Sequence, residues 1–340
     1  MFNKLIIIKV VFLLGCILLA FPFGCVTSDN AENDPVGREG IPLAPPSFPS
    51  VTFEHEMGSV GDAIRALGVQ REGGVVLMSG LEERALPKVI FRHTPYQNVI
   101  TQIADAIECD CLYTSSYYLI LPAAYHALQN LQISEDLDVR YKSLSASVAF
   151  GAKTELYNAF SMLGASLDIT IIADNMIAEA RCGELFLANA PFPVILEAVL
   201  QSARIAPGTF VVESTPEYIF IRSLQNRGTE SRVINSSTLT HEQKALLDEE
   251  VSLILPDRKA AARNTLAAAP ITLQEALLPL TVQLGVEIVV QKKLGDIPIN
   301  PCRMSAVNLE TALTLLLRQW PLPGFGFEVQ EGRILIRERE

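Results

Sequence analysis

Histidine and cysteine are the residues of this sequence whose chemistry could bind a metal or activate a nucleophile. The four histidines stand in different segments, at His55, His93, His126 and His241. None has a second ligand type at zinc-site spacing, and Cys109-x-Cys111 has no partner pair. Gly73-Gly74 is typical of a turn before a strand, not of a phosphate loop, and no Gly-x-Ser-x-Gly elbow occurs. We therefore expect a protein that is not an enzyme, with no catalytic, metal or cofactor site.

The composition favours an exported or membrane-tethered globular protein. Lys and Arg number 27 against 38 Asp and Glu in 340 residues, a formal net charge of −11. Because phosphate binding needs clustered Lys and Arg, and no such cluster appears, nucleic acid is not an expected partner. Hydrophobic residues make up 49% and charged residues 19%, which argues against a disordered chain or a coiled coil.

The start of the chain has the pattern of a secretory signal peptide, which we assign to residues 1–24. Residues 1–4 are a short positive start, and residues 5–23 are almost wholly apolar. The apolar run after Lys9 is about 14 residues, shorter than the roughly 20 that a spanning helix needs. The polar, proline-containing residues 25–50 then predict an extended, disordered tether.

Phe23-Gly24-Cys25 resembles the end of a bacterial lipoprotein signal, in which a small residue precedes a cysteine that receives lipid. Cys16 also follows a small residue, but it would leave a short apolar region that contains Lys9, so we expect lipidation at Cys25. Val26 replaces the aspartate typical of inner-membrane retention. The resemblance thus implies a lipid anchor on the periplasmic face of the outer membrane. A soluble periplasmic protein and an inner-membrane anchor remain the alternatives.

An internal repeat is the most informative pattern of the sequence. Apolar residues at i, i+3, i+4 and i+7 predict two amphipathic helices, the second beginning 36 residues after the first. This pair occurs three times, with starts at Val60 and Tyr96, at Leu156 and Phe192, and at Leu273 and Leu309. Equal offsets in three places are hard to obtain by chance, so we predict three copies of one unit.

Short runs rich in β-branched residues fall between and after these helices. Predicted strands lie at 75–77, 169–172 and 286–290, alternating pairs begin at 89, 185 and 302, and closing hairpins lie at 112–121, 210–221 and 327–336. A first strand is predicted at 51–55 and at 146–150. In the third copy, 251–255 has the stronger composition and 264–267 the matching offset. The fold class is α+β, with three tandem β-α-β-β-α-β-β domains.

This order of elements resembles the secretin and TonB N-terminus short domain, a module of secretin pores and of signalling TonB-dependent receptors. The residues that carry the resemblance are 60–67, 75–77, 89–91, 96–107 and 118–121. Small KH-like modules of the secretin periplasmic ring share part of the pattern. No secretin pore region follows the third copy, so the resemblance implies a recognition or assembly module and not a channel.

The predicted organisation follows from the copies and the stretches between them. It comprises a signal peptide (1–24), a tether (25–50), domain 1 (51–122), a linker (123–144), domain 2 (145–223), a linker with a short helix (224–250) and domain 3 (251–338). Thr240 and Gln243 have the spacing of a capping box at the start of that helix. Domains this small bury only about 60% of their unfolded surface, so packing against neighbours is expected to matter.

Comparison of the copies also predicts the roles of the cysteines. Cys109, Cys182 and Cys302 stand where other copies have apolar residues, which indicates small buried side chains. Export permits disulfides. Alternate residues of a strand lie about 7 Å apart, which makes a Cys109–Cys111 bond awkward. A Cys182–Cys302 bond would have to cross domains, and the presence of any disulfide stays open.

Two functions are consistent with these features. The first is an interaction or assembly module of an envelope secretion, pilus or uptake system, whose partner by resemblance is a secretin or TonB-dependent complex. Its candidate interaction edges are the closing strands, because an unpaired edge accepts another strand. These residues are Leu119, Ile120, Leu121, Ile219, Phe220, Ile221, Ile334, Leu335 and Ile336. The alternative is a ligand- or signal-sensing lipoprotein that binds a small molecule or glycan between domains, near the tyrosines around the first linker.

Overall fold

The computed structural model describes residues 50–70, 74–225, 232–258, 269–320 and 324–338. These residues are α+β, with short helices and small sheets, and they belong to one compact unit. The predicted signal peptide, nearly all of the tether, and Cys25 lie outside the described residues.

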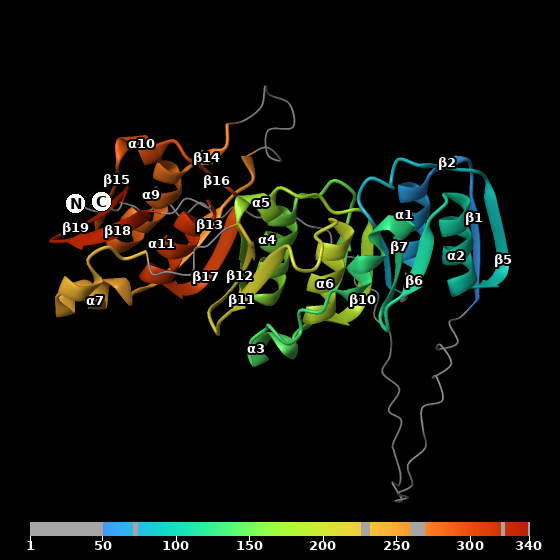
Figure 1. The fold of residues 1–340 in the computed structure, drawn as a ribbon, viewed down its shortest axis with the longest axis horizontal. Helices are drawn as coiled ribbons and strands as arrows, with labels where there is room; N and C mark the ends of the chain where they lie inside the picture. Colours follow the sequence, from blue (N-terminus) through green and yellow to red (C-terminus); the bar gives the residue numbers. More distant parts are fainter. Residues whose placement is uncertain (1–49, 71–73, 226–231, 259–268, 321–323, 339–340) are drawn as a thin grey trace, which may run out of the picture. The chain divides into compact units, whose positions relative to one another are not determined.

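Residues 50–121, called repeat 1 below, contain two helices, two pairs of strands and a group of three strands (Figure 1). The elements are β1 (Ser50–His55), β2 (Gly58–Ser59), α1 (Val60–Gln70), β3 (Gly74–Leu77), β4 (Ala85–Leu86), β5 (Val89–Pro95), α2 (Tyr96–Ala106), β6 (Asp110–Tyr113) and β7 (Tyr117–Leu121). β1 pairs antiparallel with β5. β7 lies between β3, its parallel partner, and β6, its antiparallel partner.

Residues 145–223 (repeat 2) show the same main strand pairing around two helices, with an additional short helix and without the β2–β4 pair. The elements are β8 (Ser145–Phe150), α4 (Leu156–Leu167), β9 (Thr170–Ala173), α5 (Asn175–Ala178), β10 (Leu185–Pro191), α6 (Phe192–Ser202), β11 (Phe210–Ser214) and β12 (Tyr218–Ser223). β8 pairs antiparallel with β10, and β12 lies between β11 and the parallel β9. A short 3-10 helix η1 (Ala123–Asn130) and helix α3 (Val139–Lys142) precede this repeat.

Residues 250–338 (repeat 3) show this arrangement again. The elements are β13 (Glu250–Leu255), β14 (Ile271–Thr272), α9 (Leu273–Leu284), β15 (Glu287–Val290), α10 (Lys292–Gly295), β16 (Pro298–Ile299), β17 (Cys302–Asn308), α11 (Leu309–Arg318), β18 (Phe325–Gln330) and β19 (Arg333–Glu338). β13 pairs with β17, and β19 lies between β18 and the parallel β15. Before them come η2 (Ser236–Thr238) and α7 (His241–Leu247).

The predicted helix starts are confirmed, since each is the first residue of a helix in the structure. The first strand of the third copy is also decided, because β13 pairs with β17, whereas residues 264–267 lie outside the described residues. α7 begins with the predicted capping box, in which Thr240 and Gln243 bond each other's backbone N–H.

A backbone detail that the sequence did not predict recurs in the strand before each second helix. His93, Asn189 and Ala306 have φ angles of +49°, +46° and +49°, each beside an irregularity in strand pairing. Their N–H groups donate to hydroxyls on the facing strand. The acceptors are Thr52 at 3.4 Å, Ser147 at 2.9 Å and Ser252 at 3.1 Å, respectively. The same β-bulge with the same hydroxyl bond thus occurs in all three repeats.

The prediction that the closing strands are unpaired edges is wrong. β7, β12 and β19 are each the middle strand of three, in the orders β6-β7-β3, β11-β12-β9 and β18-β19-β15. The residues concerned are Leu119, Ile120, Leu121, Ile219, Phe220, Ile221, Ile334, Leu335 and Ile336. The strand after the first helix returns beside the closing strand and satisfies its backbone groups, so the edges belong to other strands.

Candidate interaction surface

The sheet of repeat 1 accepts a strand from repeat 2. β3 pairs antiparallel with β10, with Val76 opposite Leu185 and Val75 opposite Phe186. The result is a five-stranded sheet in the order β6-β7-β3-β10-β8. Just beyond this pairing, the N–H of Leu77 donates to the carbonyl of Glu184 at 2.8 Å. The edge of one repeat is therefore a strand-docking site already used within the chain.

The first helix of repeat 1 adds side-chain contacts to this junction. A Cβ at Gly68 of α1 would overlap the ring of Phe186, so the glycine permits close approach of helix and strand. One turn earlier, Arg65 forms an ion pair with the carboxylate of Glu184. The Glu184 side chain is fully buried, whereas that of Arg65 is 53% exposed. Hydrogen bonding to Glu184 raises the pKa of Arg65.

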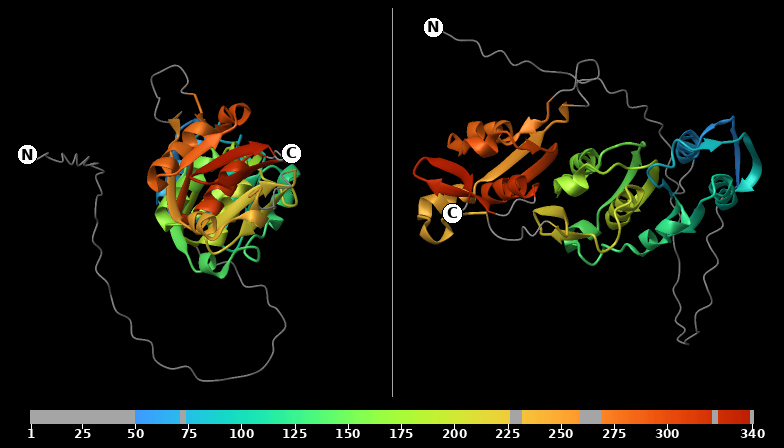
Figure 2. Two further views of the ribbon diagram at one scale, coloured as in Figure 1. Left: turned by 90° about the vertical axis from the view of Figure 1, so that its left-hand side faces the viewer. Right: turned by 45° about the horizontal axis from the view of Figure 1, so that its top comes forward.

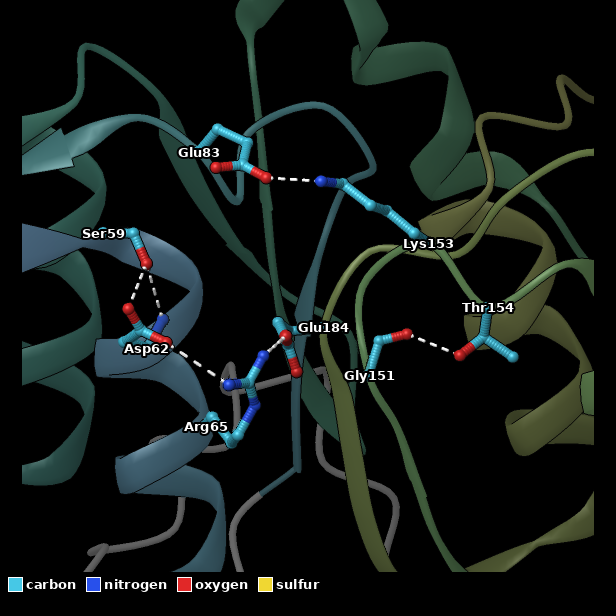
Figure 3. Close-up of polar contacts among 8 residues, drawn as sticks. All are labelled: Ser59, Asp62, Arg65, Glu83, Gly151, Lys153, Thr154 and Glu184. Atoms are coloured by element: carbon cyan, nitrogen blue, oxygen red, sulfur yellow. Dashed lines mark hydrogen bonds and ion pairs between the residues drawn. The ribbon is translucent and has the colours of Figure 1, made fainter. Parts of the chain in front are cut away.

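Solvent-exposed polar contacts surround the buried carboxylate (Figure 3). Asp62 Oδ1 lies 3.3 Å from Arg65 Nη1, and the Ser59 hydroxyl donates to Asp62 Oδ2 at 2.7 Å. Lys153 of repeat 2 reaches Glu83 of repeat 1 with an Nζ–Oε1 distance of 2.5 Å. Such exposed pairs contribute little to stability, so the buried contacts determine the junction.

Repeats 2 and 3 meet through the corresponding elements. β17 lies against β9 and α4, as β10 lies against β3 and α1. The Ser305 N–H donates to the Thr170 hydroxyl at 3.0 Å, and the Ser305 hydroxyl donates to Asp168 at 2.8 Å. In Figures 1 and 2 the ribbon of repeat 2, green to yellow, lies beside both the blue-to-teal repeat 1 and the orange-to-red repeat 3.

Arg318, the last residue of α11, adds a buried cation to the second junction. The Arg318 guanidinium stacks 4.2 Å above the ring of Phe220 and pairs with Glu213, both on the hairpin of repeat 2. Arg318 is almost fully buried, with 3% of its surface exposed. Glu213 also pairs with Arg222, at 2.5 Å, so one carboxylate serves two guanidinium groups.

One backbone hydrogen bond is identical at the two junctions. The N–H of Ser79 donates to the carbonyl of Ser202 at 2.8 Å, and the N–H of Asn175 donates to that of Gln319 at 2.8 Å. The two donors are 96 residues apart and the two acceptors 117, which are the spacings of the successive first helices. The two junctions therefore share this hydrogen bond, although only the first also pairs strands of the two repeats, β3 with β10.

Burial shows what each junction covers. The facing pairs Val76 and Leu119 in repeat 1, and Ile172 and Phe220 in repeat 2, are 0 to 3% exposed. The corresponding pair in repeat 3 is Val289 and Leu335, and both residues are only half-buried. The next repeat supplies the cover in the first two cases, and no described residue supplies it in the third.

Among the described strands that are equivalent to those at the junctions, two have no neighbouring repeat, and we call them the N-terminal edge and the C-terminal edge. The N-terminal edge is β5, which among the described strands pairs only with β1 and carries Ile90 with 50% of its surface exposed. The C-terminal edge is β15 with the adjacent helix α9. Among the described strands β15 pairs only with β19, and α9 exposes Leu278 at 57% and Val282 at 83%. Both edges expose apolar side chains beside unpaired backbone.

Comparison with protein-family models, with curated proteins and with solved structures found no match to this chain. The resemblance to the short N-terminal domain of secretins and TonB-dependent receptors therefore stays a prediction. Within the described ranges, no helix is long and apolar enough to cross a membrane. The same residues hold no group of three or more His, Cys, Asp or Glu side chains that could bind a metal.

The cysteines have the buried environment that the comparison of copies predicted. Cys109, Cys182 and Cys302 are 0 to 6% exposed, and the four cysteines of the described residues are all free thiols. Burial raises the pKa of Cys182 to about 11 and that of Cys302 to about 12. These thiols are therefore protonated at neutral pH and act as apolar packing groups.

The tyrosines around the first linker belong largely to the core. Tyr117, Tyr118, Tyr141 and Tyr157 are 0 to 6% exposed. A cavity of about 40 Å³ beside Tyr157 has room only for water. A wider hollow of about 580 Å³ next to α4 is open and, apart from the buried Tyr157, lined by half-buried and exposed residues. Neither has the enclosed, mostly apolar shape of a typical ligand site.

Sequence reasoning found the elements of the surface but not the surface itself. The run at 75–77 is apolar without alternation, which is the signal of a strand buried on both faces. The equivalent run in repeat 3, residues 288–290, is equally apolar, but its strand begins with Glu287, where β3 has Gly74 and β9 has Thr170. That difference marks the strand left uncovered, and it could have been read from the sequence.

Proposed function

We propose that this chain is a non-catalytic, membrane-tethered interaction or assembly module of an envelope secretion, pilus or uptake system. It is built from three tandem copies of a small domain that resembles the secretin and TonB N-terminus short domain. The observation that carries the proposal is the mode of joining. Repeat 2 docks on repeat 1 by strand addition, repeat 3 places the equivalent strand β17 against β9 of repeat 2 without a strand pairing, and the two outermost edges keep the surface that this docking uses.

Strand addition suits a module that assembles with other proteins. Backbone hydrogen bonds give affinity that depends little on sequence, while side chains such as Ile90 and Leu278 give specificity. Their exposed apolar area is the kind of surface that marks a protein interaction site when it is contiguous with a free edge.

The proposed cellular location rests on the N-terminal segment. A lipid on Cys25 would hold the protein on the periplasmic face of the outer membrane, and residues 25–50 would let the repeats reach a partner. A secretin or a TonB-dependent receptor complex is the partner that the resemblance suggests. Soluble periplasmic and inner-membrane-anchored forms are the alternatives for location.

The test is a crosslinked pull-down of the full chain from membranes. We expect wild type to incorporate lipid label and to capture a secretin or TonB-dependent receptor, and Cys25→Ser to lose both the label and the membrane association. Ile90→Asp should abolish capture, whereas Val139→Asp, at a position in α3 that is 79% exposed and far from both edges in sequence, should not. Equal capture by both variants, or capture of neither class of complex, would contradict the proposal.

A ligand- or signal-sensing lipoprotein is the second candidate, and the hollow beside α4 is the observation that favours it. Lys153, Asn158 and Asp257 line it with polar groups, as a site for a glycan would require. Envelope glycans should then raise the melting temperature of wild type but not of Asn158→Ala. No shift with any glycan would leave the interaction role as the function.

A further inference from the structure

We propose that the occupant of the two outer edges is a second copy of this chain, with the N-terminal edge of one copy added to the C-terminal edge of the next. This deepens the interaction role proposed above and rests on it. The contact would repeat, between molecules, the strand pairing that joins repeats 1 and 2, made by the same elements that also meet between repeats 2 and 3.

The strand register follows from the equivalence of the repeats. At the first junction Val75 lies opposite Phe186 and Val76 opposite Leu185. The corresponding residues at the outer edges are Ile288 opposite Ile90 and Val289 opposite Val89. Ile90 is half exposed and Ile288 and Val289 are half-buried, so apolar residues stand at all the required places.

Complementary charges stand just beyond these pairs, in diagonal positions, because this register places Glu287 opposite Phe91, next to Arg92. At the second junction Ser305 of β17 lies against Thr170 of β9. The corresponding residues at the outer edges are Arg92 of β5 and Glu287 of β15, both exposed. A cation on one edge would thus face a carboxylate on the other.

A second ion pair could form with the signs of its two partners exchanged. At the second junction Arg318 pairs with Glu213, which also holds Arg222. Asp105 occupies the place of Arg318 in repeat 1, and the pair Glu328 and Arg337, at 2.9 Å, occupies the place of Glu213 and Arg222 in repeat 3. Asp105 would therefore bond to Arg337 instead of to the carboxylate.

The contact would also cover what repeat 3 leaves open. Val289 and Leu335 would gain the cover that makes Val76 and Leu119 fully buried. Leu278 and Val282 of α9 would lie beside the incoming β5, as α1 lies beside β10. Because the two edges differ, the contact is head-to-tail, and repeated addition gives an open filament or a closed ring.

The test is disulfide crosslinking of the full-length protein in membranes under a mild oxidant. Ile90→Cys combined with Ile288→Cys should give a ladder of dimers, trimers and larger species, because residues opposite in antiparallel strands lie within disulfide reach. Either single variant should stop at dimers. Ile90→Cys with Val139→Cys is the matched control, since Val139 is exposed but lies on neither edge. No ladder, or an equal ladder in the control, would overturn the proposal.

Charge exchange gives an independent readout. Arg92→Glu should reduce the laddered fraction at least several-fold, and adding Glu287→Arg should restore it. Thermal melting of each variant checks that it folds. If no ladder forms while a secretin or receptor is still captured through Ile90, the second copy is excluded and the interaction role stands. If neither a ladder nor capture through Ile90 is observed, the second-copy proposal and the interaction role are both contradicted.

Discussion

The N–H of Leu77 donates to the carbonyl of Glu184 at 2.8 Å, across the junction of repeats 1 and 2. The Glu184 side chain bonds Arg65 at the same place, so backbone and carboxylate hold two distant segments together. Apolar residues of both repeats also belong to one buried cluster. The junction is thus part of the core, and changes there should alter the stability of both repeats together.

Removal of the Arg65 guanidinium should destabilise the junction. In Arg65→Met the Glu184 carboxylate stays buried without its cation, and we expect a loss of about 1–2 kcal/mol, moderated because Arg65 is half exposed. Urea unfolding measures the change. Lys153→Met removes the exposed pair with Glu83 and should have no measurable effect, so equal losses in the two variants would show that Glu184 is solvated.

A methyl group at Gly183 should separate the joined strands. A Cβ there would collide with the backbone carbonyl of Leu77, which cannot move without breaking the pairing of β3 with β10. Gly183→Ala should lower the free energy of unfolding by roughly 1–3 kcal/mol, as overpacking does elsewhere. A Cβ at Gly151 meets nothing within 4 Å, so Gly151→Ala is the control. Equal stability of the two variants in urea titrations would contradict this close approach.

The elements of the fold were predictable because hydrophobic periodicity records which face of a helix or strand is buried. Val60, Leu156 and Leu273 begin their helices as the spacing predicted. The pattern does not show which other elements cover that face. Residues 75–77 are apolar because helices α1 and α6 pack against β3, and α6 lies more than a hundred residues further along the chain. The joining of repeats therefore needed coordinates.

The candidate edges failed for a related reason. A closing hairpin in sequence looks like the end of a sheet, but the parallel partner of β7, β12 or β19 comes from earlier in the chain. A positive φ angle is equally hard to recognise in the sequence. Asn189 suits such a position, whereas nothing in the side chain of Ala306 indicates it.

Glycine at position 306 should stabilise the protein. Ala306 has a φ of +49°, which costs an L-residue with a Cβ roughly 1–2 kcal/mol and costs glycine almost nothing. We expect Ala306→Gly to raise the free energy of unfolding by up to about 1 kcal/mol, after the larger entropy loss of glycine. Ala188 is also exposed, one residue before the corresponding bulge position, and its φ is not positive. Ala188→Gly should therefore lower stability, and a loss in both variants would argue against the bulge geometry at Ala306.

Thiol labelling should show that Cys182 and Cys302 are protected in the folded chain and reactive in the unfolded chain. With pKa values raised to about 11 and 12, Cys182 and Cys302 are almost wholly protonated at pH 8, and the thiolate is the species that reacts. Iodoacetamide should leave both unmodified in the folded full-length chain and modify both in concentrated urea, as read by mass spectrometry of peptides. Because burial disfavours the thiolate, the folded chain holds these protons above pH 9 while the unfolded chain releases them. Stability should consequently fall as the pH rises from about 9 towards the raised pKa values. Rapid modification of Cys302 in the folded chain would mean that β17 is not covered as described.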